Sequence, residues 1–305
     1  MLTVAISGAE LTPKNQKMQR DLEHRLNRWF QTTSNGICAE IRKKYKIGMK
    51  KARKQTAVLE PETSDAEGDD LQTELLVGGK KIPAWQSDLI RAIALMGWKG
   101  INWEELVAIM QPYLQEAGYE GVDVGVGQVQ MTDAKRRQQA AEAEAEAYAD
   151  RRSAELAGMK RNAEGELVPD PDAHWPLTDV MRRDIENSIT QAVVEGWTVE
   201  QLDAVIDASY ALSAERATVI ANTEITNAQS GGTYSLWRQS GTVTLVRWVT
   251  SDMHDQDDEC DDFESQGVVP LGHEFAEGLF APRAHPFCRC SLEVVDPNED
   301  LPVTL

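Results

Sequence analysis

Cysteine and histidine residues gather near the C-terminal end of the chain in a pattern typical of a metal site. Three of the four cysteines lie between positions 260 and 290, and the step His285-Pro-Phe-Cys288-Arg-Cys290 can present two or three donor side chains from one tight turn. Structural zinc sites take four ligands from cysteine thiolates and histidine imidazoles. We therefore predict a structural zinc ion held by Cys260, His285, Cys288 and Cys290, with His254 as a substitute ligand. Such an ion would fasten a segment that has few apolar residues of its own.

Two other interpretations fit the same residues. The cysteines can be small buried side chains or free thiols without a metal, and a Cys-x-Cys step is less typical of zinc sites than Cys-x-x-Cys. One of the two cysteines in that step can also point away from the ion. A Cys260–Cys288 disulfide is the third interpretation, which a reducing cytoplasm disfavours. Cys38 stands alone, and four cysteines are too few for a disulfide scaffold in a chain of 305 residues.

An acidic run from Asp252 to Glu264 overlaps the cysteine pattern. It holds eight carboxylates, and carboxylate oxygens are ligands for hard divalent cations. The run lacks the glycine and the terminal glutamate of an EF-hand loop, which favours a solvated acidic loop. His273–Glu274 begins like a zincin motif but has no histidine four residues after the first. No serine elbow, phosphate-binding loop or dinucleotide fingerprint appears, so we predict no enzyme; the alternative is a metal-dependent nuclease or peptidase that uses the acidic Cys/His loop.

Short strands and long helices must position these side chains. Residues 242–250 are β-branched and alternating, which predicts a strand, and residues 291–295 are a second candidate. The stretch between them has about 40 residues, which is long for a loop in a compact domain and indicates a site or a clip that holds it. Three helices are expected before the first strand, with Thr178, Thr198 and Ser213 at their N-terminal ends.

The N-terminal half is mainly helical in pattern. Residues 14–54 repeat apolar side chains at helical spacing, and residues 83–98 and 101–118 fit two packed amphipathic helices. The stretch 118–131 contains four glycines and is expected to hold a strand or a loop. Residues 133–157 are nearly all helix formers with few large apolar side chains, which is typical of a helix that bridges solvent or packs through alanine against partner subunits.

These patterns predict an α+β fold that is mostly α-helical. A helical N-terminal region precedes a C-terminal helical domain with a small β element and a Cys/His-rich loop. The prolines between 169 and 176 cannot continue a helix and mark the main boundary. The expected parts are a basic helical arm at 1–58, an acidic linker at 59–74, a helical region with the charged alanine-rich helix at 75–168, the C-terminal domain at 177–296 and a tail at 297–305.

Charge is divided unevenly along the chain. The formal net charge is −19, yet residues 1–54 hold 13 Lys and Arg against 4 Asp and Glu. Phosphate contact needs clustered cations, so nucleic-acid binding by the whole protein is disfavoured. Residues 14–54 alone can contact DNA or an acidic protein surface, and a solvated helix face is the alternative. No apolar stretch reaches membrane-spanning length and the first residues make a poor secretory signal, so we expect no membrane partner and a soluble cytoplasmic product.

Four motifs follow one another in the C-terminal third: the helical RATVIANTE, the strand end RWVT, the acidic DDEC and the closing HPFCRC. In this order they resemble the phage Mu F-like head morphogenesis family. Asn222 departs from the pattern, because an arginine often precedes the Thr-Glu pair there. The matching positions are Arg216, Ala217, Ile220, Ala221, Thr223, Glu224, Trp248, Thr250, Asp257, Cys260, His285, Cys288, Arg289 and Cys290.

The resemblance covers roughly residues 178–295 and makes the part at 177–296 a Mu F-like domain. It implies a minor head protein of a tailed bacteriophage, present in few copies in the virion and made in the host cytoplasm. It also implies action at or near the portal in head assembly, with a role in DNA packaging or delivery. The implied partners are the portal protein and the major capsid or scaffolding protein. Some relatives fuse this domain to toxin or transferase modules, but residues 1–170 show no such catalytic module.

Overall fold

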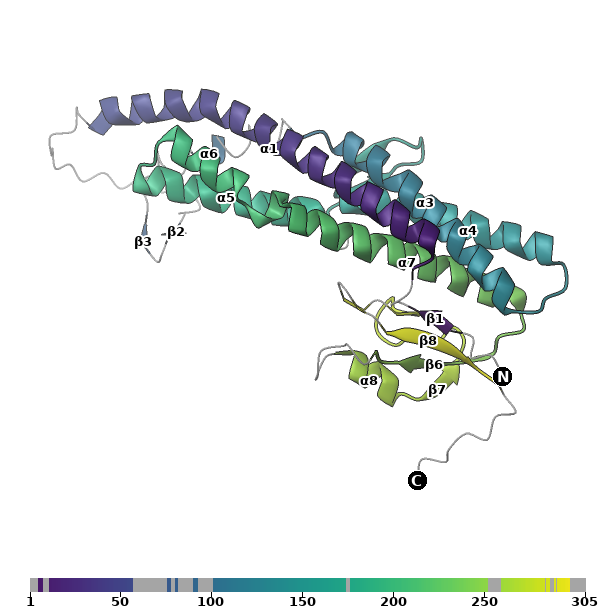
Figure 1. The fold of residues 1–305 in the computed structure, drawn as a ribbon. Helices are drawn as coiled ribbons and strands as arrows, with labels where there is room; N and C mark the ends of the chain where they lie inside the picture. The colour runs from purple at the N-terminus through teal and green to yellow at the C-terminus, as the bar shows by residue number, and fades with distance from the viewer. Residues whose placement is uncertain are drawn as a thin grey trace. The chain divides into compact units, whose positions relative to one another are not determined.

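The structure is a computed structural model of the chain. It describes residues 5–7, 11–56, 76–77, 80–81, 90–92, 101–173, 176–251, 259–282, 284–285, 288 and 290–296. The fold is mostly α-helical with small antiparallel strands, which confirms the expected fold class (Figure 1). Several predictions lie outside the described residues: the acidic linker at 59–74, most of the helix at 83–98, the tail at 297–305 and His254.

The chain forms two compact units, each built from separate stretches of sequence. Helix α1 (Pro13–Thr56) contributes its residues up to Leu26 to unit 1 and the remainder to unit 2. Unit 1 also contains β1 (Ala5–Ser7), α3 (Trp103–Gln128) from Glu104 onward, α4 (Ala134–Leu156), β4 (Met159–Arg161), β5 (Leu167–Pro169), α7 (Ala214–Ser240), β6 (Leu245–Val249), α8 (Glu259–Ser265), β7 (Val268–Pro270) and β8 (Ser291–Val295). Unit 2 contains β2 (Leu76–Val77), β3 (Lys80–Lys81), α5 (Leu177–Glu195), α6 (Val199–Asp207) and the 3-10 helix η1 (Tyr210–Leu212).

The glycine-rich stretch at 118–131 is not a strand or a loop, because α3 continues through it to Gln128. Glycine disfavours a helix by about 1 kcal/mol relative to alanine, but here it allows α3 to approach its neighbours closely. A Cβ on Gly118 would lie 2.8 Å from the Cβ of Ala145 on α4, and a Cβ on Gly121 would overlap the backbone of Gln229 on α7. The close packing of three helices explains why the stretch is helical.

Helix α4 uses its alanines for packing within unit 1. Ala141, Ala145 and Ala149 recur every four residues and are buried, and α4 packs extensively along α7. Small side chains let the two helix backbones come near each other. The sequence predicted solvent bridging or packing against partner subunits for this helix; instead its small-residue face packs within the chain, where Ala145 lies beside Gly118 of α3.

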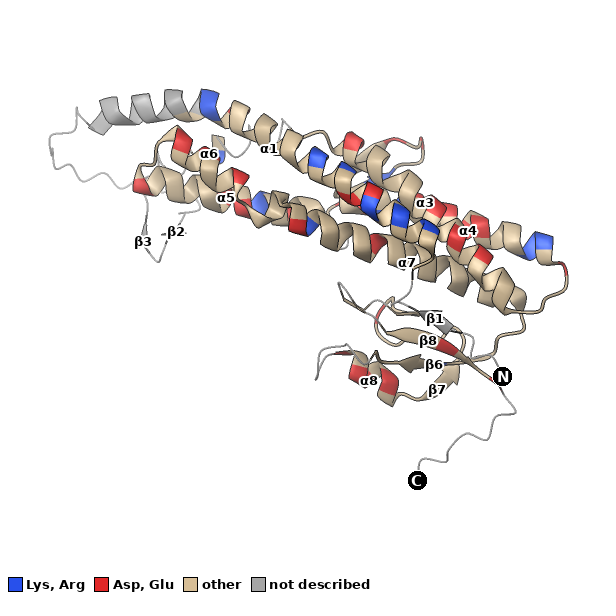
Figure 2. Cartoon of the chain, viewed as in Figure 1, with Lys and Arg blue, Asp and Glu red and all other residues tan. Residues whose placement is uncertain are grey.

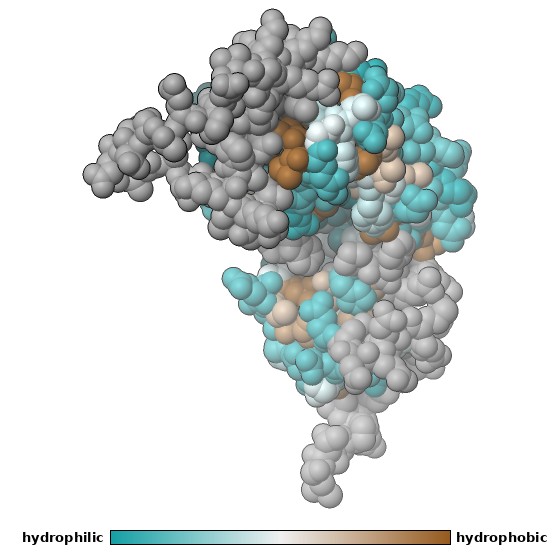
Figure 3. Space-filling model, turned by 90° about the vertical axis from the view of Figure 1, so that its left-hand side faces the viewer, coloured by the Kyte–Doolittle hydropathy of each residue, from teal (hydrophilic) through white to brown (hydrophobic). Residues whose placement is uncertain are grey.

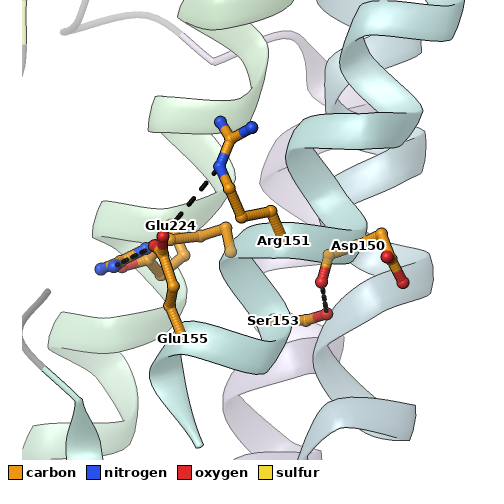
Figure 4. A network of polar contacts seen from close by, with 6 residues as sticks. Asp150, Arg151, Ser153, Glu155 and Glu224 are labelled. Atoms are coloured by element: carbon orange, nitrogen blue, oxygen red, sulfur yellow. Dashed lines mark hydrogen bonds and ion pairs between the residues drawn. The ribbon is translucent and has the colours of Figure 1, made fainter. Parts of the chain in front are cut away.

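A buried ion pair joins α4 to α7. The guanidinium of Arg152 donates from Nη2 to Glu224 Oε1 at 2.8 Å and from Nε to Glu224 Oε2 at 3.0 Å. Only 5% of the Glu224 side chain is exposed. Figure 4 shows Glu224 of α7 facing the end of α4, where Glu155 also lies. Burial by itself lowers the pKa of Arg152, but the charge of Glu224 and its hydrogen bonds raise that pKa overall, so the pair remains ionic.

The four-stranded antiparallel sheet has the order β1-β8-β6-β7. Strand β8 occupies the predicted range 291–295, whereas β6 is shorter than the predicted 242–250. The sequence did not reveal β1 and β7, because three-residue strands leave almost no alternation to detect. It also did not reveal the β4–β5 hairpin within the region expected to be helical.

The structure tests the residues predicted at the N-terminal ends of α5, α6 and α7. Thr198 caps α6 through a capping box, since its hydroxyl accepts from the Gln201 amide while the Gln201 side chain accepts from the Thr198 amide. Thr178 does not cap α5: Pro176 occupies the N-cap position and Thr178 is buried inside the first turn. In unit 1, α7 begins directly after Ser213, as predicted, and runs to Ser240 without interruption.

The described surface is mostly polar on the face drawn in Figure 3, where apolar residues appear as separate spots. Among the described residues, no helix combines the length and the apolar composition that a membrane span requires. Basic residues recur along α1, and acidic residues mark α3, α4 and α8 (Figure 2).

Candidate metal centre

Cys260 enters the cluster from α8, a short amphipathic helix. Cys260 and Phe263 are three residues apart and buried, whereas Glu259, Asp262 and Glu264 are exposed. Residues at this spacing share one face of a helix. The acidic face is therefore solvated and the thiol points into the protein.

The other candidate ligands precede β8. His285 and Cys288 lie in the irregular segment before the strand, and Cys290 is the residue directly before Ser291. The exposed fractions of the three cysteines Cys260, Cys288 and Cys290 are 0%, 1% and 0%. Pairing of β8 with β6 fixes the end of this segment, so the sheet positions the closing part of the cluster.

Three aromatic residues form a shell in the same buried core as the cysteines. The ring of Trp248 on β6 lies 5.0 Å from that of Phe263 and 5.1 Å from that of Phe275, both in edge-to-face contact. These residues belong to the same buried core as the three cysteines, together with Leu292. Exclusion of water by such a shell strengthens the interaction of thiolates with a cation.

The donor atoms of Cys260, His285 and Cys288 lie within 4.8 Å of one another and can hold a metal ion. The Sγ atoms of Cys260 and Cys288 are 3.7 Å apart, and the Cys260 Sγ atom is 3.5 Å from His285 Nε2. A tetrahedral zinc ion with Zn–S near 2.3 Å and Zn–N near 2.0–2.1 Å would separate two sulfurs by about 3.8 Å and a sulfur from a nitrogen by about 3.6 Å. Both separations match the zinc tetrahedron, so the residues fit the ion.

The pKa values of the Cys260 and Cys288 thiols are shifted in opposite directions. The pKa of the Cys288 thiol is lowered because the Cys260 and Cys290 thiols hydrogen-bond to its thiolate. The pKa of the Cys260 thiol is raised by its hydrogen bonds to Cys288 and Cys290 and by burial. Of these two thiols, Cys288 is therefore the one that ionises first, and metal binding would have to displace the proton of Cys260.

The structure brings together three of the predicted ligands and places the fourth beside them. Cys290 is buried next to the Cys260 and Cys288 thiols but is not one of the three mutually close donors. The prediction for His254 lies outside the described residues. Cys38 lies on α1, where its thiol is 4.0 Å from Asp207 Oδ1. None of the four cysteines, all of which the structure describes, is in a disulfide, so Cys260 and Cys288 are not bonded to each other.

The acidic run differs from the expected loop in its described part. Residues 252–258 lie outside the described residues, and the rest of the run is helix α8. Glu264 accepts hydrogen bonds from the backbone amide and the hydroxyl of Thr250, both at 2.9 Å, which ties α8 to the end of β6. His273 is not part of the cluster, since its ring packs on Phe275 and its Nε2 lies 2.7 Å from Gln266 Oε1.

Sequence reasoning missed the aromatic residues that share the buried core with the cysteines. The sequence identifies Trp248 only as a position of the strand-end motif RWVT, and it gives Phe263 and Phe275 no role. One signal was present: Phe263 follows Cys260 at helical spacing, within an otherwise acidic run. Phe275 had no such signal, because it lies in an irregular segment between β7 and β8.

No curated protein and no solved structure matches the chain. A family model does match, and it is described as Phage Mu protein F like protein. The matched segment begins within α5, contains α6, α7, β6, α8 and β7, and ends within β8. It therefore includes the whole Cys/His cluster. Residues 183–293, the C-terminal part of the chain, match the Phage Mu protein F like family, as the sequence motifs predicted.

Proposed function

We propose that this protein is a minor head protein of a tailed bacteriophage that acts at or near the portal during head assembly. The observation that carries the proposal is the family match of residues 183–293, which suggests a role in phage head morphogenesis. The location follows from it: the virion head, and the host cytoplasm during assembly. Portal protein and major capsid or scaffolding protein are the proposed partners, and DNA packaging or delivery is the proposed stage.

A structural zinc ion at Cys260, His285, Cys288 and Cys290 is part of this proposal. The ion would contribute charge neutralisation and a cross-link between α8 and the segment before β8. Cys290 is the proposed fourth ligand because it is buried beside two of the other thiols. Atomic-emission analysis of the purified protein should give about one zinc per chain, and Cys288→Ser should lower that ratio while Cys38→Ser should not. A zinc-free folded protein would contradict this part.

We propose that the cluster does no catalysis. A catalytic zinc keeps one position open to substrate, whereas a structural zinc is closed by four protein ligands. The burial of Cys260 and Cys288 favours the closed kind of site. If Cys288→Ser leaves the fold intact and abolishes a nuclease or peptidase turnover of the wild type, the metal-dependent enzyme becomes the better account.

Contact with DNA through residues 14–54 is the least constrained part of the proposal. Lys17, Arg20 and Arg28 are exposed on α1, and lysine and arginine at a DNA backbone make binding dependent on salt. Deletion of the whole arm would also remove buried residues of α1, so the informative variant changes these three residues to glutamine. Lys135→Gln, Arg136→Gln and Arg183→Gln together, at exposed positions of α4 and α5, are a control for the loss of three charges. Equal DNA retention in both variants would remove the arm from the proposed DNA contact.

The experiment that tests the main proposal is quantitative mass spectrometry of purified DNA-filled particles and procapsids. A few copies per particle are expected for a minor head component. Crosslinking in the same particles should join the chain to the portal protein more often than to distant capsid subunits. Absence from both filled particles and procapsids would contradict the assembly role.

A further inference from the structure

The short strand β1 meets the sheet next to the cysteine cluster. Its three residues pair with only the first three residues of β8: Ser7 with Ser291, Ile6 with Leu292 and Ala5 with Glu293. The residue before Ser291 is Cys290, and Cys288 lies two positions earlier. Figure 1 shows β1 along the edge of the sheet formed by β8. The N-terminal strand therefore binds the part of β8 that directly follows the cluster.

Strand β8 pairs with one neighbour along each edge, and the two pairings differ in length. Strand β6 pairs with five residues of β8, from Ser291 to Val295, whereas β1 pairs with three. A strand of three residues is marginal by itself. Any loosening at the start of β8 therefore affects all of the pairs with β1 but only part of the pairs with β6.

The cluster connects α8 to the segment that leads into β8. Cys260 on α8 lies 3.7 Å from Cys288 and 3.5 Å from His285, across a separation of 28 and 25 residues. A metal ion bound to these atoms would close this long connection and hold Cys288 against α8. Removal of such a cross-link returns conformational freedom to the connection.

We propose that the Cys/His cluster is a metal-dependent latch for the N-terminal strand: an ion at Cys260, His285 and Cys288 orders the start of β8, and β1 docks on that edge only when it is ordered. The latch rests on the metal binding proposed above. The chain after β1 is also bound to α7. The backbone amide of Thr12 and the side chain of Asn15 both donate hydrogen bonds to the side-chain oxygen of Gln229. When the latch opens, these contacts keep α1 attached while the β8 edge becomes available to another strand.

Hydrogen exchange measured by mass spectrometry on the full chain tests the latch. Zinc-loaded protein is compared with protein treated with a chelator, and the zinc content of each sample is measured in parallel. Those amides of residues 5–7 that face β8 should exchange about tenfold faster after chelation, whereas the amides of α3, α4 and α7 should not change. Cys38→Ser is the control for thiol loss and should behave like the wild type.

The reverse experiment uses the reciprocity of coupled binding. Ile6→Pro removes the amide of Ile6 from β1, and Ile6→Val retains it. If the strand and the ion are coupled, Ile6→Pro should weaken zinc affinity by the same factor, about tenfold, by which chelation loosens β1. Ile6→Val should leave the affinity unchanged.

The outcomes separate the latch from the zinc site. About one zinc per chain with unchanged exchange at residues 5–7 would overturn the latch and leave the structural zinc in place. A folded protein that binds no zinc would overturn both. Neither result bears on the presence of the protein in phage heads, which the particle measurement tests independently.

Discussion

Two regions of unit 1 are held together by different means. The helical region comprises α3, α4 and α7, and the sheet region comprises β1, β6, β7, β8 and α8. In the helical region, long elements pack through glycine and alanine, and the Arg152–Glu224 pair is buried between two of them. In the sheet region no described strand exceeds five residues, and the centre is occupied by cysteines and aromatic rings.

The difference indicates which region gains more stability from a bound metal ion. Three long helices can bury enough surface to be stable through their own shape and charge. Short strands with a long irregular connection bury less and gain more from a cross-link. We therefore expect substitutions in the helical region to act on stability without affecting metal content, and metal removal to act on the sheet region first.

The largest effect is expected from Arg152→Met. This change leaves the Glu224 carboxylate buried without its cation, and breaking a buried pair from one side costs about 3–5 kcal/mol of stability. Chemical denaturation should show the loss. The zinc content of the fraction that remains folded should not change.

The double variant Arg152→Met with Glu224→Met is the control for this prediction. Replacement of both charges by apolar side chains of similar volume is often close to neutral. Recovery of most of the lost stability would show that the uncompensated charge was the cause. If the single variant were as stable as the wild type, the ion pair would not be what joins α4 to α7.

Metal removal should have the next largest effect. An ion that binds only the folded state at a free concentration of about 100 times its dissociation constant stabilises that state by about 2.7 kcal/mol. Chelation should therefore lower the melting temperature and loosen α8 and β8 before α4 and α7, as followed by hydrogen exchange. Uniform loosening of both regions would show that the sheet region does not depend on the metal more than the helical region does.

A smaller effect is expected at the glycines of α3, where the chain offers a matched pair. Gly121→Ala places a Cβ against the backbone of Gln229, which should cost about 1–3 kcal/mol because overpacking forces backbone shifts. Gly127 has no atom within 4 Å of an added Cβ, so Gly127→Ala should stabilise the helix by up to about 1 kcal/mol. Thermal unfolding of both variants measures the difference, and equal effects would exclude close packing as the reason for the glycines.

Much of the fold could be predicted because the long helices carry their own signals. Apolar spacing and polar start residues located α1, α6 and α7, and the change to alternating β-branched residues located β6 and β8. The glycine stretch of α3 was misjudged because local propensity argues against a helix there. Only the nearness of α4 at Gly118 and of α7 at Gly121, which the sequence does not reveal, makes glycine favourable there.

The sequence was enough to predict the ligands of the candidate site, but not the aromatic residues that pack in the same core. Cysteine and histidine are chemically distinctive, so Cys260, His285 and Cys288 could be chosen from type and spacing, and the structure brings them together. The shell depends on which distant aromatic rings meet in three dimensions. Trp248 and Phe275 are 27 residues apart in the sequence, and only the folded chain brings their rings to 5.1 Å from each other.

The smallest effect is expected where α8 joins the end of β6. Glu264→Ala removes the carboxylate that accepts from the Thr250 amide and hydroxyl at an exposed position, so the loss should be about 0.5–1 kcal/mol. Glu259→Ala, on the same exposed face of α8, is the control for the loss of one charge. If the metal fixes α8 more strongly than this contact does, Glu264→Ala should destabilise the chelated protein more than the zinc-loaded protein. Equal destabilisation in both states would mean that the ion does not hold α8, and the sheet region would then owe its order to the aromatic core.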